Sequence, residues 1–329
     1  MENRTFGKTG WTVSSIGFGA WAIGGSWGSV DDTQSKAALH ATLDAGVTFL
    51  DTADVYGDGH SERLIAEVLA ERGDQDRPIV ASKAGRRLDP HIASAYTIDA
   101  IEGFLDRTLT NLRVERLDLL QLHCPPTPVY DDASMFEGLD GLIQAGKLHH
   151  YGVSVETIDE ALTALDYPGL ASVQIIYNAF RQRPAEELFI KAGAKNVAII
   201  ARVPLASGLL TGKLSAKSTF QADDHRAFNR HGEAFDVGET FSGVPYEAGL
   251  AAVDALRPLV PEAIPMAQWA LRWILMEEAV TVAIPGARTP EQALSNAQAA
   301  DLAPLSADVM AQVREVYDAH IAPHVHHRW

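Results

Sequence analysis

The sequence predicts an α/β fold in which eight parallel strands, each followed by a helix, close into a (β/α)8 TIM barrel. Short apolar runs alternate with longer amphipathic stretches along nearly the whole chain, and fully apolar runs are typical of parallel strands buried on both faces. The length of 329 residues suits a barrel of roughly 250 residues with insertions. We expect residues 1–329 to form a single domain, because no linker, low-complexity tract or charge run marks a second one.

The predicted strands are short, rich in Val, Ile and Leu, and bounded by turn residues. They cover residues 15–19, 48–51, 79–82, 117–123, 148–154, 172–177, 198–202 and 280–284. Helical patterns lie between them at 32–45, 61–70, 98–112, 135–145, 157–165 and 186–194, and a last barrel helix begins at Pro290. Cap signals mark helix starts, for example Thr157 followed three residues later by Glu160. This alternation favours a closed barrel over an open sheet.

Three segments depart from the simple repeat. The residues before Ser15 predict a hairpin that turns at Thr9-Gly10 and closes the bottom of the barrel. Segment 203–246, after the seventh strand, has little periodicity, and a loop of this length is usually functional. Residues 307–320 predict an extra helix, followed by a tail with three histidines. We interpret this tail as docked at the pocket mouth rather than as a metal site, because no carboxylate lies beside the histidines at ligand spacing.

Composition restricts the class of partner. The chain has 27 Lys and Arg against 43 Asp and Glu, a net charge of −16, which opposes binding to nucleic acid and to anionic membrane surfaces. The chain lacks an apolar leader and a membrane-length apolar run. Its one cysteine, Cys124, fits a reducing compartment and a small core side chain. We therefore expect a cytoplasmic protein that acts on a small molecule.

One apparent motif is set aside. Residues 17–22 read GFGAWA and match the dinucleotide fingerprint G-x-G-x-x-G/A after a strand. That fingerprint requires a helix to begin on the loop, whereas residues 24–28 are rich in glycine and poor in helix formers. The glycines more plausibly let a loop pass close to a ligand.

Four polar residues follow consecutive predicted strands. Asp51 ends the second strand, Tyr56 lies in the next loop, Lys83 follows the third strand and His123 ends the fourth. The carboxyl ends of barrel strands converge on one face, where the active sites of this fold lie. Singly, such residues are more often a helix cap, an exposed lysine or a core histidine. Together they predict one catalytic site.

These residue types suit reduction of a carbonyl group, which needs a hydride on carbon and a proton on oxygen. A phenol has a pKa of about 10, and a neighbouring ammonium group lowers it. Asp51 would keep Lys83 charged, and His123 would hydrogen-bond the substrate oxygen. We therefore predict Tyr56 as the general acid, tuned by Lys83.

At this point the sequence resembles the aldo-keto reductase superfamily over nearly its whole length. The matching segments are FLDTADVYG at 49–57, ASK at 81–83, DLLQLH at 118–123, YGVS at 151–154, QIIYN at 174–178, PLASGLLTGK at 204–213 and IPGARTP at 284–290. The chain is similar to the bacterial branch related to general-stress and inositol-operon reductases, and more distantly to potassium-channel β subunits. The resemblance implies an NAD(P)-dependent oxidoreductase acting on CH–OH groups and the catalytic tetrad Asp51, Tyr56, Lys83 and His123.

The resemblance also implies a set of cofactor contacts. They are Gly19, Trp21, Ser154, Gln174, Arg202, Pro204, Leu205, Ser207, Gly208, Lys213, Gly286, Arg288, Gln292 and Asn296. Ser154 and Gln174 would hold the nicotinamide carboxamide, and the 204–213 belt would cover the pyrophosphate. Arg288 lies just before a helix, which favours NADP(H) over NAD(H), and no metal is expected. The chain departs from its relatives at Val155 (commonly Asn), Arg202 (commonly aromatic), Gly286 (Lys in some) and Gln292 (Arg in some).

The substrate pocket is predicted to include Trp21 and Trp27, since such walls are generally apolar or aromatic. We expect the segment around Phe228–Phe241 to form a lid. The basic residues of this region would meet a polar or anionic substrate or simply face solvent; they are His225, Arg226, Arg230 and His231. Three alternatives to a reductase remain open: the same site working oxidatively as a sugar or alcohol dehydrogenase, a cofactor-binding regulatory subunit, and a metal-dependent barrel enzyme. The last would need more carboxylates and histidines at the strand ends than Asp51 and His123 supply.

Overall fold

The computed structural model describes residues 1–25, 31–73 and 77–329, so Trp27 lies outside the described residues. Eight strands form one parallel sheet in sequence order. They are β3 (Phe18–Gly19), β4 (Phe49–Asp51), β5 (Ile79–Ala84), β6 (Leu117–His123), β7 (Leu148–Ser154), β8 (Leu170–Ile176), β9 (Ala198–Arg202) and β10 (Val280–Ala283). Parallel bridges Ile16–Ala283 and Gly19–Gly286 join the first strand region to the last. The predicted (β/α)8 barrel is therefore confirmed.

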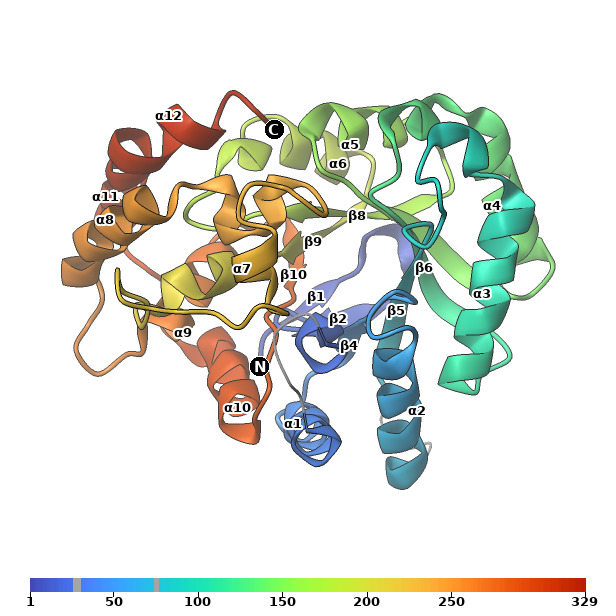
Figure 1. Cartoon of the computed structure of the whole chain (residues 1–329), viewed down its shortest axis with the longest axis horizontal. Helices are drawn as coiled ribbons and strands as arrows, with labels where there is room; N and C mark the ends of the chain where they lie inside the picture. The colour runs from blue at the N-terminus through green and yellow to red at the C-terminus, as the bar shows by residue number, and fades with distance from the viewer. Residues whose placement is uncertain (26–30, 74–76) are drawn as a thin grey trace.

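The helices surround the barrel (Figure 1). They are α1 (Asp32–Asp44), α2 (His60–Arg72), α3 (Ile98–Leu112), α4 (Ala133–Gln144), α5 (Ile158–Ala164), α6 (Leu188–Ala194), α7 (His225–Phe228), α8 (Tyr246–Leu256), α9 (Met266–Leu275), α10 (Pro290–Gln298), α11 (Ala307–Val316) and α12 (Ala322–Val325). Thr157 and Glu160 form the capping box that their spacing predicts. The sequence analysis did not predict α8 and α9. Among the described residues, no helix is both long enough and apolar enough to cross a membrane.

The barrel has two apolar layers because its strands are buried on both faces. Inward-facing side chains such as Phe49, Leu119 and Ile200 form the inner cluster. A larger cluster packs between the outer strand faces and the helices. This packing leaves polar side chains at the strand ends, where the chain enters its loops.

The N-terminal hairpin closes the amino-terminal end of the barrel, as predicted. β1 (Asn3–Thr5) pairs with β2 (Thr12–Ser14), and Gly10 in the turn has φ 79°. Phe6 is fully buried, and its ring stacks on Phe49 with centroids 5.4 Å apart. Gly7 lies so close to β9 that a Cβ there would be 2.8 Å from the Ala198 nitrogen.

Segment 203–246 lies over the opposite end, drawn in yellow and orange in Figure 1. It contains α7 and short 3-10 helices at Ala206–Thr211, Val237–Glu239 and Phe241–Gly243. The predicted C-terminal helix is α11, which continues through a π-helical turn into α12. The tail ends in Trp329, whose ring lies 4.0 Å from the Arg181 guanidinium and donates to Asp236 at 3.2 Å. The tail therefore docks on segment 203–246.

Candidate active site

The carboxyl ends of adjacent strands bring the predicted polar residues into one register. Gly19 pairs with Asp51, and His123 pairs with Ser154. Ser154 in turn pairs with Gln174 across β7 and β8. The structure therefore gathers residues that lie up to 123 positions apart, as for Asp51 and Gln174.

Lys83 is the centre of the polar cluster. Its ammonium group donates to the Asp51 carboxylate, to the Thr52 carbonyl at 2.9 Å and to the Tyr56 hydroxyl at 3.4 Å. Burial alone would lower the pKa of Lys83, but attraction to Asp51 and Tyr56 outweighs it and raises the pKa above its ordinary value. Lys83 is thus held as a buried cation against the phenol oxygen.

Tyr56 is fixed by the loops around it. Two glycines allow the first loop to approach: a Cβ on Gly24 would lie 2.7 Å from the Tyr56 Cβ, and one on Gly57 would lie 2.1 Å from the Gly24 oxygen. The Trp21 ring stacks on Tyr56 at 6.1 Å between centroids. Burial raises the pKa of Tyr56, Lys83 opposes the rise and Asp51 adds to it. Lys83 therefore lowers the pKa of Tyr56 as expected, but burial outweighs this effect and the net pKa is raised.

His123 lies edge-on to Tyr56, with ring centroids 5.9 Å apart. Burial holds its pKa well below the ordinary value, and the nearby cations Arg86, Lys83 and Arg202 lower it further. The imidazole is therefore neutral at physiological pH. Its Nδ1 is buried and has no hydrogen-bond partner among the residues that the structure describes.

Two glutamines hold the far oxygen of Asp51. Gln121 donates to Asp51 Oδ2 at 3.0 Å and Gln174 donates to the same oxygen at 2.8 Å. Gln174 also donates to Gln121 at 3.0 Å. The sequence analysis missed Gln121, although it lies two residues before His123 and therefore faces the same side of the strand. Gln174, predicted as a nicotinamide contact, orients Asp51 in this structure.

The predicted cofactor belt has an unusual backbone. Ala206, Ser207 and Gly208 all have positive φ, at 47°, 52° and 99°, and runs of this kind turn successive N–H groups toward anions. The Ser207 hydroxyl donates to the Glu239 carbonyl at 3.2 Å and accepts from the Phe241 nitrogen at 3.0 Å. Lys213 is exposed at the end of the belt, after the more buried Pro204 and Leu205.

The predicted adenosine-end residues lie together at the start of α10. Asn296 donates to the Gly286 carbonyl at 3.1 Å, and the Gln292 side chain accepts from the Arg288 nitrogen at 2.8 Å. Gly19 bridges to Gly286 from the first strand. This arrangement places Arg288 two residues before the first residue of α10, beside the closure of the barrel.

Arg202, predicted to stack on the nicotinamide, belongs to a group of four buried charged residues that we call the quartet: Arg86, Glu156, Arg202 and Glu239. Arg202 contacts Glu156 at 2.8 Å and Glu239 at 3.5 Å. Arg86 contacts Glu156 at 3.0 Å and also Glu239. The sequence analysis missed Arg86, Glu156 and Glu239, because no periodic pattern links the loops that carry them.

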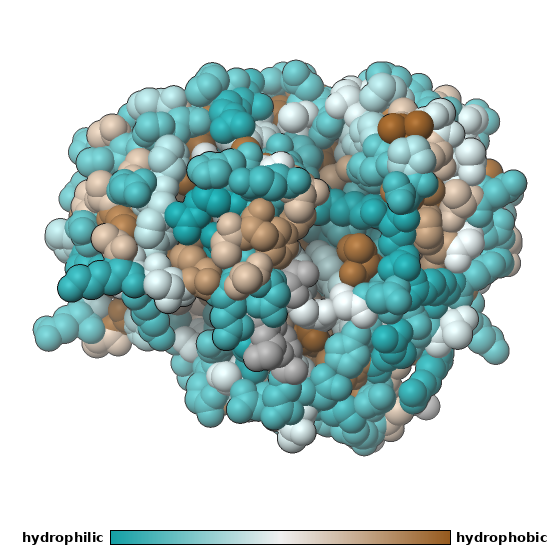
Figure 2. Space-filling view, in the orientation of Figure 1, coloured by the Kyte–Doolittle hydropathy of each residue, from teal (hydrophilic) through white to brown (hydrophobic). Residues whose placement is uncertain are grey.

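The aromatic wall above Tyr56 comes from two loops. Trp21 meets His225 at 4.7 Å and Phe235 at 5.9 Å between ring centroids, and both partners belong to segment 203–246. The predicted lid therefore contacts the first loop directly. Figure 2 shows apolar side chains gathered near the centre of this face, inside a mostly hydrophilic rim.

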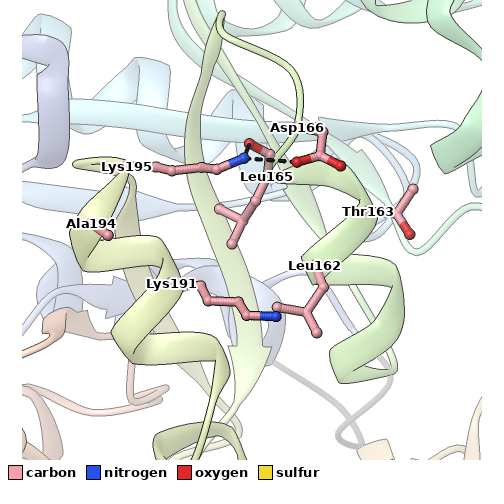
Figure 3. Close-up of a pocket in the computed structure, with 7 residues that line it drawn as sticks. All are labelled: Leu162, Thr163, Leu165, Asp166, Lys191, Ala194 and Lys195. Carbon is pink, nitrogen blue, oxygen red and sulfur yellow. Dashed lines mark hydrogen bonds and ion pairs between the residues drawn. The ribbon is translucent and has the colours of Figure 1, made fainter.

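A separate surface pocket of about 520 Å³ lies in the helical layer (Figure 3). Its lining comes from α5, α6 and the turns that follow them: Leu162, Thr163, Leu165, Asp166, Lys191, Ala194 and Lys195. The Lys195 ammonium donates to the Leu165 carbonyl and the Asp166 carboxylate, both at 2.8 Å. None of the strand-end residues lines this pocket.

Comparisons with known proteins identify the family of this chain. The model of the aldo/keto reductase family matches residues 15–318. Aldo-keto reductase YhdN from Bacillus subtilis is 32% identical over 300 residues, covering 89% of this chain and 86% of the relative. A probable voltage-gated potassium channel subunit beta from Oryza sativa subsp. japonica is 28% identical over 323 residues, covering 93% of each chain. The solved structure of the glycerol dehydrogenase AKR11B4 from Gluconobacter oxydans has a TM-score of 0.77, is 28% identical and covers 97% of this chain and 96% of its own.

Proposed function

Because the chain belongs to the aldo/keto reductase family of oxidoreductases, we propose that it reduces an aldehyde, ketone or sugar carbonyl with NADP(H) and that Tyr56 donates the proton. One observation carries the proposal: the buried Lys83 ammonium lies between Asp51 and the Tyr56 hydroxyl, 3.4 Å from the latter. A cation beside a phenol favours loss of the phenolic proton. The pair therefore suits proton donation to an alkoxide that forms in front of it.

Each residue of the polar cluster has its own role in the proposed reduction. A bound reduced nicotinamide supplies a hydride to the carbonyl carbon. The neutral His123 imidazole hydrogen-bonds the substrate oxygen and sets its direction. Tyr56 gives its proton to that oxygen as negative charge develops there, and the phenolate that remains faces the Lys83 ammonium. Asp51, held by Gln121 and Gln174, keeps Lys83 charged.

The described residues fit a dinucleotide. Within the left-handed backbone at Ala206–Gly208, the Ala206 and Gly208 nitrogens donate to the Val203 and Leu205 carbonyls. We therefore assign to the pyrophosphate the Ser207 N–H group and the positive charge of Lys213. Ser154, at the end of β7, stands beside His123 for the carboxamide. Arg288 before α10 suits the 2′-phosphate that distinguishes NADP(H). These positions support NADP(H) over NAD(H).

A second candidate is the same site working oxidatively on a sugar or alcohol. The similarity to a glycerol dehydrogenase supports it, and the proton path from alcohol to Tyr56 is the reverse of the one above. The similarity to potassium channel subunits beta supports a third candidate, a cofactor-loaded regulatory subunit. The complete polar cluster favours an enzyme over the regulatory subunit.

The proposal is tested with a panel of aldehydes, ketones, sugars and the matching alcohols, each assayed by nicotinamide absorbance with NADPH, NADH, NADP+ and NAD+. We expect turnover of carbonyl compounds with NADPH that exceeds turnover of alcohols with NADP+ at neutral pH. Tight NADPH binding without turnover of any compound would support the regulatory subunit instead. Alcohol oxidation that dominates at neutral pH would support the dehydrogenase.

A further inference from the structure

The quartet is a closed ring of opposite charges beside the candidate active site. Each guanidinium contacts both carboxylates, so two positive and two negative groups alternate. The four side chains are only 7–17% exposed. Three follow barrel strands β5, β7 and β9, whereas Glu239 comes from segment 203–246.

The quartet lies next to residues that neighbour Tyr56 and His123. Arg202 lies 3.7 Å from the sulfur of Cys124, the residue after His123. The Arg86 guanidinium lies 5.8 Å from the Phe235 ring, which packs on Trp21. The quartet thus belongs to the same wall as the aromatic side chains above Tyr56.

We propose that the quartet makes this site select uncharged carbonyl compounds over those that carry a carboxylate or phosphate, and that Glu239 is the residue that sets this preference. The inference rests on the proposed reductase function. Two largely buried guanidinium groups beside an active site would ordinarily bind anions. Here Glu156 and Glu239 already occupy them.

An anionic substrate meets two obstacles at this wall. It must displace a carboxylate that is ion-paired in a buried place, and it adds negative charge beside two carboxylates. An uncharged carbonyl compound leaves the ion pairs intact. The aromatic groups Trp21 and Phe235 then supply its contact surface.

A metal ion is a poorer explanation of the same cluster. Cys124, Glu156 and Glu239 offer ligand atoms within 4.8 Å of one another. However, guanidinium groups contact both carboxylates, and burial raises the pKa of the Cys124 thiol to about 12. A cation would therefore compete with two fixed positive charges for a neutral thiol and two paired carboxylates.

The two carboxylates differ in ionisation. Burial raises the pKa of Glu156 to about 7 despite the pull of Arg202 and Arg86, because Glu239 and Asp236 repel its charge. Burial also acts against Glu239, but Arg86 and Arg202 outweigh it and lower its pKa to about 2. The two guanidinium groups therefore favour the charged form of Glu239, whereas burial favours the protonated form of Glu156.

The test compares 4-carboxybenzaldehyde with 4-formylbenzamide, which differ in charge and little in size, by kcat/KM with NADPH at pH 8.5. We expect the wild-type protein to prefer the amide by about tenfold or more, and Glu239→Gln to move the ratio toward the carboxylate by about tenfold. Glu233→Gln is the matched control: it removes the same charge from an exposed residue of the same segment, and it should leave the ratio unchanged. An equal ratio in wild type and Glu239→Gln would overturn the proposal.

If Glu239→Gln does not fold, the pH dependence of the carboxylate-to-amide ratio of kcat/KM in the wild-type protein tests the proposal. Burial raises the pKa of Glu156, so lowering the pH from 8.5 to 6 favours its protonated form and makes the charge of the quartet more positive. The carboxylate-to-amide ratio should therefore rise. Titration of Tyr56 or His123 changes both rates together and cancels in the ratio. A ratio that stays flat with pH in that case overturns the proposal, whereas absence of turnover with every carbonyl compound of the panel rejects the reductase function itself.

Discussion

The two ends of the barrel are closed by different kinds of contact. At the amino-terminal end, Phe6 and Val13 of the hairpin region are fully buried among inward-facing apolar side chains. At the carboxyl-terminal end, the closing contacts are the Lys83–Asp51 pair and the quartet, which bury charge. Buried charges cost desolvation free energy that apolar packing does not. The comparison indicates that one end stabilises the fold and the other is organised for chemistry.

The largest expected effect comes from breaking the charged end at Lys83. Lys83→Met leaves the Asp51 carboxylate buried without its cation, which should lower the free energy of unfolding by about 3–5 kcal/mol. Loss of the ammonium beside Tyr56 should also reduce kcat by about 10²–10⁴-fold. Chemical denaturation and steady-state kinetics measure the two effects.

A double variant separates stability from chemistry at the same place. Asp51→Asn with Lys83→Met removes both charges while keeping an acceptor for Gln121 and Gln174. We expect most of the stability to return and the activity to stay lost. Recovery of activity in the double variant would show that Lys83 matters only as the partner of Asp51.

At the amino-terminal end of the barrel, a substitution should lower stability without lowering activity. Phe6→Ala removes a fully buried ring that stacks on Phe49, so the free energy of unfolding should fall by about 3–5 kcal/mol. kcat/KM measured well below the unfolding temperature should change little. Phe6→Leu, which keeps most of the volume, is the control and should cost less. A large loss of kcat/KM in folded Phe6→Ala would remove the distinction between the two ends.

The smallest of these effects concerns the cofactor. Arg288→Ala should raise the Kd of NADPH by about tenfold and change the Kd of NADH much less, because only NADPH carries the 2′-phosphate. Quenching of protein fluorescence measures both constants, and NADH serves as the internal control. Equal losses for the two cofactors would reject the phosphate contact.

Strands and helix caps could be predicted from the sequence because each depends on a local pattern of residues. Apolar runs bounded by turns predicted the strands, and the barrel then brings their carboxyl ends together, so Asp51, Lys83 and His123 could be grouped without knowing any distance. The capping box at Thr157 is equally local.

Contacts made by a segment without a hydrophobic period could not be predicted from the sequence. Glu239 and Phe235 reach the site through segment 203–246, which has no hydrophobic period to fix its course. The partners Arg86 and Glu156 then look like ordinary loop charges. The net rise in the pKa of Tyr56 was also outside the reach of sequence, because it depends on how fully loops such as the one at Gly24 bury the phenol.

The most direct test of the central claim is the behaviour of Tyr56→Phe, which removes only the phenolic oxygen. We predict that NADPH binding, measured by fluorescence quenching, stays within about twofold, while single-turnover carbonyl reduction falls by about 10²–10⁴-fold. Reduction at the wild-type rate in the NADPH-loaded variant would contradict the assignment of the proton to Tyr56.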